Sequence, residues 1–277
     1  MPKFSLIIAT LGRVDELSSL LSSIRAQQYN DFEVIIVDQN QKGVLDEVVS
    51  SFSADMTIKH YVVGFRGAAK ARNYGFVRSS GELIYFPDDD CEFVDDVLQK
   101  ADDYFARTES LDVLCGKCVD REGRDSVIQF HPSSSLLTAK TYMGMFVEAT
   151  MFFKRQVFMN SQFDESLGVG VFHGSEEGRD LVIRLLAKNA TMYYDPIIFV
   201  YHPSKVVNHS KESEHRRVFT YRCGFSKLCL KHRMHGELFS RIALVGLYIP
   251  FLLITNKRKV RYYCAEMMGL LTGIIIK

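Results

Sequence analysis

The sequence predicts an α/β fold in which a mostly parallel central sheet is flanked by helices. Over residues 4–63, apolar runs of strand length alternate with segments whose apolar residues recur at helical spacing, in the order strand, helix, strand, helix, strand. The first run, Phe4 to Thr10, is almost continuously apolar, which is typical of a parallel strand buried on both faces. Sheets of this kind bind ligands at the carboxyl ends of their strands.

Each element follows from its own pattern. Apolar side chains three or four positions apart predict helices over residues 14–24 and 44–52, and apolar runs predict strands over 32–37 and 58–63. Further along, the same criteria predict strands at 83–86, 112–119, 146–153 and 193–201, and helices beginning near Gly67 and over 94–106 and 181–187. Residues 121–135 are polar and contain Gly123 and Pro132, so we expect a surface loop there.

Composition bounds the function. The chain has 277 residues, of which 47% are hydrophobic, enough for a sizeable core, and a formal charge of +1 gives no field that would favour nucleic acid. Six scattered cysteines lack the spacing of a zinc site, which indicates reduced thiols in a cytosolic protein. The N-terminus passes from Lys3 directly into the first strand, so we expect no signal peptide.

An apolar strand that ends on three carboxylates, Asp88, Asp89 and Asp90, predicts a metal site. Two like charges about 4 Å apart repel by about 1 kcal/mol in water and about 4 kcal/mol at an effective dielectric near 20, so a counter-cation is expected. Carboxylate oxygens suit Mg²⁺ or Mn²⁺. Thr10 and Asp38 end two earlier strands and would share this rim. The alternative is a solvated turn, which Pro and Asp also favour.

Two other segments offer polar groups for a ligand. The helix expected after Gly67 would present backbone N–H groups, Lys70 and Arg72 to a phosphate, unless its small residues serve only close packing. Glycine-bearing residues 163–175 lead into three acids, Glu176, Glu177 and Asp180. Either glutamate would share a helix face with Asp180, although acids at a helix start also complement the helix dipole.

Taken in order, these motifs resemble family 2 glycosyltransferases of the GT-A fold, most closely bacterial enzymes that build surface polysaccharides such as O-antigen or capsule. The resemblance covers residues 4–203. Its motifs are Ala9-Thr10, Ile36-Val37-Asp38, Ala71-Arg72-Asn73-Tyr74-Gly75, Gly81-Glu82-Leu83-Ile84, Pro87-Asp88-Asp89-Asp90, Ser175 to Asp180, and Val200-Tyr201-His202-Pro203. Each motif is weak alone, whereas the ordered set is specific.

The resemblance implies a role for each matched residue. Asp38 matches the acid that contacts the nucleotide base, and Asp88 the first aspartate of a DxD-type motif near the ribose. Asp90 matches the aspartate that coordinates a metal on the donor diphosphate, and His202 matches a further metal ligand found in some relatives. The remaining donor-site candidates on the same rim are Thr10, Arg72, Asn73 and Asp89.

The general base is where the sequence departs from its relatives. They often carry Glu-Asp-x-Asp or Glu-Glu-x-Asp with the base in second position, and counting back from Asp180 that position is Gly178. We therefore expect the base to be Glu177, then Glu176, then Asp180. Inverting transfer needs one such base, and a metal ion to stabilise the departing diphosphate.

The resemblance therefore implies a metal-dependent, inverting hexosyltransferase that uses Mn²⁺ or Mg²⁺. It would move a sugar from a nucleotide diphosphate, UDP-hexose by preference, to an undecaprenyl-diphosphate-linked glycan during lipopolysaccharide or related synthesis. A sugar-phosphate nucleotidyltransferase is disfavoured because Thr10 to Arg13 carries only one glycine, and a dehydrogenase because no GxGxxG follows the first strand. A sugar-nucleotide binding module without catalysis remains open because of Gly178.

The composition changes after residue 204. We expect a GT-A catalytic domain over 1–204, with a nucleotide-sugar half to about 110 and an acceptor half over 111–204, and a helical region over 205–277. That region is basic and amphipathic, and its apolar run 242–254 is shorter than the roughly 20 residues of a spanning helix. It predicts either peripheral contact with the inner face of the cytoplasmic membrane or a helix packed on the catalytic domain.

Overall fold

The computed structural model describes residues 1–94, 96–204 and 206–276, and the chain divides into two compact units. The first unit consists of 1–65, 70–162 and 181–205. The second consists of 66–69, 163–180 and 206–277. The last change of unit falls between residues 205 and 206, and segments 66–69 and 163–180 group with the C-terminal residues.

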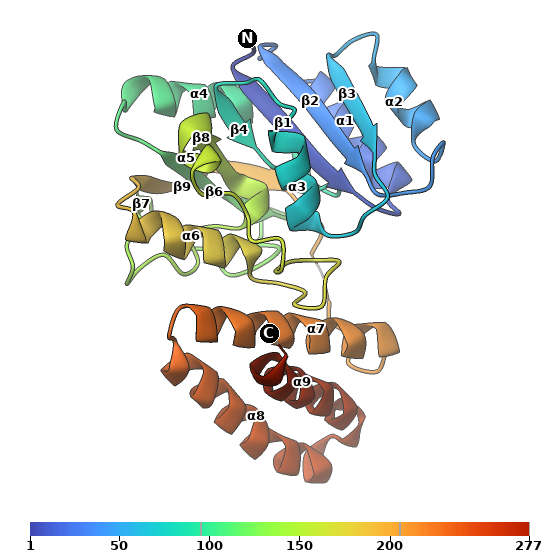
Figure 1. Ribbon diagram of the computed structural model, residues 1–277, viewed down its shortest axis with the longest axis vertical. Coiled ribbons are helices and arrows are strands. Elements are labelled where there is room, and N and C mark those ends of the chain that lie inside the picture. The colour runs from blue at the N-terminus through green and yellow to red at the C-terminus, as the bar shows by residue number, and fades with distance from the viewer. Residues whose placement is uncertain (95, 205, 277) are drawn as a thin grey trace. The chain divides into compact units, whose positions relative to one another are not determined.

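The first half of the sheet is parallel, as predicted. Strand β1 (Phe4–Thr10) lies between β2 (Phe32–Asp38) and β4 (Leu83–Tyr85), and β3 (Ile58–Val62) pairs with β2. Helices α1 (Val14–Arg25) and α2 (Asp46–Phe52) cover one face, and α3 (Ala68–Phe76) covers the other (Figure 1). The register pairs Thr10 with Asp38, so these two strand ends share one edge.

The close approach of α3 to the sheet requires a glycine. A Cβ on Gly75 would lie 2.4 Å from Ile7 Cγ2 and 3.1 Å from Val37 Cγ2. The small residues of α3 therefore bring this helix against the sheet, and they place Arg72 and Asn73, both largely buried, near the rim.

The second half of the sheet mixes directions. Strand β8 (Met151–Lys154) runs antiparallel to β4 and to β6 (Val113–Val119), and β9 (Met192–Tyr201) runs parallel to β6. The short strands β5 (Glu92–Phe93) and β7 (Ser135–Leu136) both pair with β9. The other elements of this half are α4 (Val97–Arg107), η1 (Glu148–Thr150), α5 (Arg155–Met159) and α6 (Glu177–Ala187).

The strand predicted over 146–153 was wrong in its first half. Residues Glu148–Thr150 form a 3₁₀ turn, and the paired strand begins only at Met151. The apolar run misled because Phe146 and Ala149 are buried as loop residues without belonging to a strand. The helix predicted from residue 181 begins four residues earlier, at Glu177, so two of the three candidate acids, Glu177 and Asp180, lie in its first turn.

Three helices make up most of the second unit: α7 (Glu212–Lys231), α8 (His235–Thr255) and α9 (Lys257–Ile275). Helices α7 and α9 approach closely because α9 carries glycine at positions four apart. A Cβ on Gly269 would lie 2.3 Å from the Phe219 carbonyl oxygen, and one on Gly273 would lie 2.6 Å from that of Cys223. Helix α8 completes the group by packing on both α7 and α9.

Helix α8 is longer than the apolar run that predicted it. The run of 13 residues appeared too short to span a bilayer, but the helix has 21 residues and meets the length and composition of a membrane span. The difference arises because α8 continues through Leu238, which is buried, and Phe239, which is exposed.

Candidate functional site

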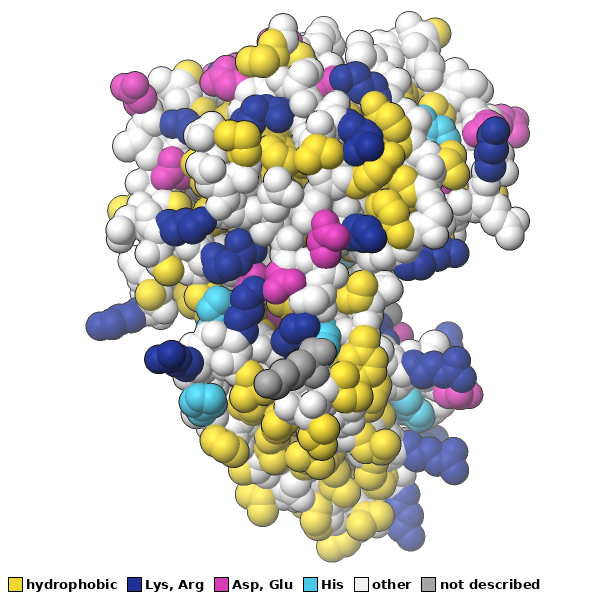
Figure 2. Space-filling view, in the orientation of Figure 1, with side chains coloured by type: hydrophobic (Ala, Val, Ile, Leu, Met, Phe, Trp, Pro, Cys, Tyr) yellow, Lys and Arg dark blue, Asp and Glu magenta, His cyan; other side chains and the backbone are white. Residues whose placement is uncertain are grey.

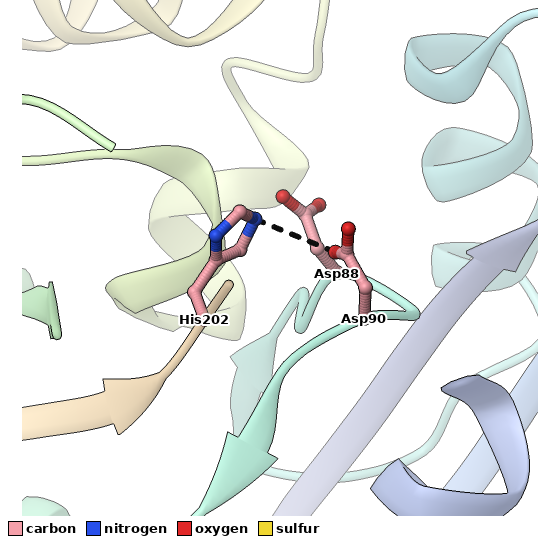
Figure 3. Close-up of side chains that lie close together, drawn as sticks. All are labelled: Asp88, Asp90 and His202. Atoms are coloured by element: carbon pink, nitrogen blue, oxygen red, sulfur yellow. Dashed lines mark ion pairs between the residues drawn. The ribbon is translucent and has the colours of Figure 1, made fainter. Parts of the chain in front are cut away.

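The aspartates after β4 and the histidine after β9 converge in the first unit. Asp88, Asp90 and His202 each offer one ligand atom, and these atoms lie within 4.8 Å of one another. His202 Nε2 is 3.4 Å from Asp90 Oδ1 (Figure 3). The family resemblance predicted Asp90 and His202 as metal ligands although they are 112 positions apart in the chain, and in the structure each follows a strand of the same sheet.

The donor set fits a divalent cation. The two carboxylates supply the oxygen ligands that Mn²⁺ and Mg²⁺ prefer, and such sites leave further positions to water and substrate phosphates. Asp90 Oδ1 is buried and has no hydrogen-bond partner among the described residues. A buried carboxylate oxygen without a partner is costly, so this atom is suited to accept a metal bond.

Two arginines balance the charge of the three aspartates. Arg72 Nη2 is 2.6 Å from Asp88 Oδ1. Arg13 Nη1 is 2.5 Å from Asp89 Oδ1 and 2.7 Å from Asp90 Oδ2. Burial raises the pKa of Asp89, and the neighbouring Arg13 opposes that rise. Arg72 was predicted as a donor-site residue. Arg13 was not, although its position directly after β1 placed it on the same rim.

Asp38 has a structural partner on each carboxylate oxygen. Its Oδ1 accepts hydrogen bonds from the Asn40 backbone N and Nδ2, both at 2.8 Å, and its Oδ2 is 3.0 Å from His60 Nε2. The Asp38 side chain is fully buried, and Thr10 beside it is 1% exposed. His60 lies on β3 and was not predicted, since nothing in its own segment distinguishes it.

A cavity of about 380 Å³ opens beside the cation ligands. Asp90 and His202 form part of its wall, together with Tyr201 and residues of the loop that follows β6. Two wall residues are already in contact, since the Arg121 guanidinium lies 4.2 Å from the Tyr201 ring centre. Charged groups and an aromatic face line this space, a combination that suits a polar ligand.

The candidate bases belong to the second unit. Glu176 is half-buried and has a left-handed backbone with φ of 77°, a conformation that is unfavourable for a residue other than glycine. Glu177 is 6% exposed, and its carboxylate packs against Gly168: a Cβ there would lie 2.9 Å from Glu177 Oε1. Gly168 also has a positive φ, of 107°, so this contact requires glycine.

Asp180 is held by ion pairs. It is fully buried, and its Oδ1 is 2.7 Å from both Lys231 Nζ and His232 Nε2, at the end of α7. Lys231 also lies 2.7 Å from Asp164 Oδ2, and the pKa of Asp164 is lowered by hydrogen bonds from Lys231 and Ser166 despite partial burial, which raises it. Asp180 therefore holds the acids against α7, which is a positioning role.

Backbone contacts attach the same segment to α7 further along. The Gly174 N–H donates to the Thr220 carbonyl at 2.9 Å, and the Ser175 hydroxyl donates to the Tyr221 carbonyl at 2.9 Å. A Cβ on Gly224 would lie 2.7 Å from the Ser175 carbonyl oxygen. Residues 174–180 are thus built onto α7 along most of its length. No pattern in the sequence predicted this attachment.

Comparison with known proteins agrees with the fold. The sequence profile described as glycosyl transferase family 2 matches residues 5–163. A GalNAc(5)-diNAcBac-PP-undecaprenol beta-1,3-glucosyltransferase from Campylobacter jejuni is 29% identical over 196 residues, which are 64% of this chain and 58% of that protein. The chain therefore matches little more than half the length of this relative.

Solved structures share the fold at low identity. The Staphylococcus aureus TarS fragment 1–349 has a TM-score of 0.61 and 16% identity, covering 99% of this chain and 90% of that one. A mannosyltransferase from Pyrobaculum calidifontis, solved with GDP-Man and Mn²⁺, has a TM-score of 0.66 and 14% identity, covering 99% and 87%. The fold agrees with the profile match, which spans more than half of the chain. The protein therefore belongs to glycosyl transferase family 2.

Proposed function

We propose that this glycosyltransferase moves a sugar, with inversion, from a nucleotide diphosphate donor to a lipid-linked glycan, and that it depends on a divalent metal. The observation that supports this most directly is the cluster of Asp88, Asp90 and His202, in which the buried Asp90 Oδ1 accepts no hydrogen bond from the described residues. The relative that acts on an undecaprenol-linked glycan supports the class of acceptor.

In this proposal the first unit binds the donor. Asp88, Asp90 and His202 hold Mn²⁺ or Mg²⁺, which when bound stabilises the negative charge of the departing diphosphate. Arg13 and Arg72 already lie against the aspartates, and each is 2.5–2.7 Å from its carboxylate partner. They supply fixed positive charge on the same rim, so the aspartate cluster does not repel an anionic donor. Thr10, Asn73 and Asp89 line this rim.

In this proposal, Asp38 and its two partners select the base of the nucleotide donor. Since Asn40 and His60 occupy the carboxylate oxygens of Asp38, we propose that the three residues read the base as a group, with UDP-hexose as the favoured donor. A group of fixed hydrogen-bonding side chains discriminates between bases because the wrong base leaves buried polar groups unpaired.

The second unit supplies the general base in this proposal. Glu177 accepts the proton of the acceptor hydroxyl, because its carboxylate is held in one place by Gly168 and the first turn of α6. Glu176 is the alternative, and its strained backbone is consistent with a site that fixes it. Asp180 is the weakest of the three, since Lys231 and His232 engage it.

Thermal unfolding with a panel of UDP-, GDP-, dTDP- and CMP-sugars, each with Mn²⁺ and with a chelator, tests the donor part. A ligand at 100 times its dissociation constant stabilises the folded state by about 2.7 kcal/mol. We expect one nucleotide class to stabilise the protein only with metal, and Asp90→Ala to abolish the effect. Asp46→Ala, which replaces an aspartate in the first turn of α2, is the matched control. If no donor stabilises the protein at any metal concentration, the proposal is wrong.

Replacing Glu177 by Gln tests the catalytic part. The variant should still bind donor, with an unchanged thermal shift, and should lose transfer by a factor of roughly 10²–10⁴. Full transfer by Glu177→Gln would exclude this residue as the base. Donor binding without transfer in the unaltered protein, with every acceptor offered, would favour a binding module. We further propose that the protein attaches peripherally to the inner face of the cytoplasmic membrane.

A further inference from the structure

Helix α8 has two apolar faces, and only one of them is covered. Leu238, Val245 and Leu252 recur every seven residues and are at most 2% exposed. Leu238 and Val245 pack in one cluster with Phe225, Cys229 and Leu270 of α7 and α9. On other sides of the helix, large hydrophobic side chains are exposed, namely Phe239 65%, Leu244 58%, Leu247 77%, Phe251 56%, Leu253 50% and Ile254 87%.

Helix α9 extends this surface. Met268, Leu271 and Ile275 follow one another at helical spacing and are 60%, 46% and 79% exposed. Figure 2 shows hydrophobic side chains gathered over the part of the second unit that α8 and α9 form. Solitary exposed hydrophobic residues are common on proteins, but a continuous patch across two helices indicates a contact surface.

The charged residues from Phe239 onward are mostly basic. Between Phe239 and Ile276 the sequence has five basic residues and one acid. The acid, Glu266, is 1% exposed and is already paired with Arg222 and Arg241. Lys257, Arg258 and Arg261 are exposed directly after the apolar end of α8. An exposed apolar face with exposed cations at the C-terminal end of α8, and with the exposed acid Glu237 paired with Arg179 at the opposite end of that helix, is complementary to an anionic lipid surface.

We propose that this apolar face of α8 and α9 lies in the interface of an anionic bilayer, with α8 parallel to the membrane plane. Helix α8 is long and apolar enough to span, but crossing the bilayer would remove Leu238 and Val245 from the helices they pack on. It would also separate Arg241 from Glu266 and leave a buried carboxylate with one fewer partner.

The membrane surface and the candidate base lie in the same unit. Arg179, next to Asp180, pairs at 2.8 Å with Glu237 in the first turn of α8. Leu244, the next exposed hydrophobic residue of the patch after Phe239, is seven residues beyond Glu237, roughly 10 Å along the helix axis. The bilayer contact therefore holds the acid-bearing segment a short distance from the lipid surface. The consequence for a lipid-linked acceptor rests on the proposed function, whereas the surface itself does not.

Flotation of the full chain with vesicles tests the surface directly. We expect flotation with phosphatidylcholine vesicles that contain phosphatidylglycerol, and weaker flotation without it. The triple variant Leu247→Ser, Phe251→Ser, Ile254→Ser should bind at least about 100-fold more weakly on both, since each side chain contributes roughly tenfold or more when buried in lipid. A control triple, Val77→Ser, Met143→Ser, Val206→Ser, replaces side chains that are 64%, 60% and 91% exposed elsewhere and should bind normally.

The basic edge has its own test. Replacing Lys257, Arg258 and Arg261 by Gln should weaken binding to phosphatidylglycerol vesicles by about fivefold per cation and leave binding to neutral vesicles unchanged. Equal flotation of the apolar triple variant and the unaltered chain would overturn the proposal. So would resistance of the membrane-bound protein to alkaline carbonate, which releases interfacial proteins and retains spanning ones.

Flotation requires no sugar nucleotide, so its outcome is independent of the proposed reaction. A protein that floats but is stabilised by no donor would retain the membrane surface and lose the proposed function. A protein that transfers sugar to a detergent-solubilised acceptor but never floats would do the reverse.

Discussion

Removing the Asp180 carboxylate separates a positioning role from a catalytic one. In Asp180→Ala, His232 and Lys231 lose a fully buried partner at 2.7 Å. Breaking a buried ion pair typically costs 3–5 kcal/mol. Because Lys231 keeps Asp164 and is 34% exposed, we expect a loss at the lower end, about 3 kcal/mol. Thermal unfolding should then occur roughly 6–12 °C lower, at 2–4 °C for each kcal/mol.

Asp164→Ala is the matched control. It removes the other carboxylate on Lys231, but this pair is 27% and 34% exposed, so its loss should cost only about 1 kcal/mol. Equal destabilisation by the two variants, or a loss below 1 kcal/mol for Asp180→Ala, would refute the conclusion that Asp180 anchors the segment to α7.

The pH dependence of transfer tells which acid is the base. In the isosteric Asp180→Asn variant, the rise of the rate with pH that reports the ionised base should remain, at a lower maximal rate. In Glu177→Gln it should disappear. The opposite assignment, with the rise lost only in Asp180→Asn, would identify Asp180 as the base and contradict the structural argument.

Three other changes have definite expected results. Gly168→Ala would add a Cβ 2.9 Å from Glu177 Oε1 at a position with a positive φ. Sugar transfer should fall at least tenfold, while donor binding, measured by thermal shift, is unchanged. Normal transfer would show that Gly168 does not fix Glu177. Burial raises the pKa of Glu33, but hydrogen bonds from Lys59, Ser5 and Ser80 outweigh it and lower the pKa from 4.5 to about 2. The ionised carboxylate therefore contributes about 3 kcal/mol of stability above pH 4.5, and this contribution is lost as the pH falls toward 2. Glu33→Gln should make the free energy of unfolding fall less steeply in acid, and an unchanged acid dependence would contradict the shift. Gly269→Ala places a Cβ 2.3 Å from a backbone oxygen of α7 and should lower the thermal midpoint by several degrees, which circular dichroism would detect.

The first unit was largely predictable because its signals are local. Continuous apolar runs predict β1 and β2. Because parallel strands end at the same edge of a sheet, the sequence also predicts that Thr10, Asp38 and Asp88 lie at one edge. His202 required more, since it reaches the cluster through β9, whose pairing with β6 no local pattern reveals. The family resemblance supplied that position.

Other features depend on contacts that a linear pattern does not contain. The sequence did not predict His60 and Arg13 as site residues, because only the fold brings them against Asp38 and Asp89. The attachment of the acid segment to α7 arises from backbone hydrogen bonds and from glycines such as Gly224, whose role depends on a partner far along the chain. Strand β8 was misplaced because burial of loop aromatics resembles burial of strand residues.

The attachment of residues 174–180 to α7 has a practical consequence for how the protein is divided. A shortened version that ends near residue 204 would keep the whole sheet but remove Thr220, Tyr221 and Lys231, on which the acids depend. Such a fragment would retain sugar-nucleotide affinity and lose turnover. Chimaeras with related enzymes should therefore exchange 163–180 and 206–277 together, because the two segments belong to the same compact unit.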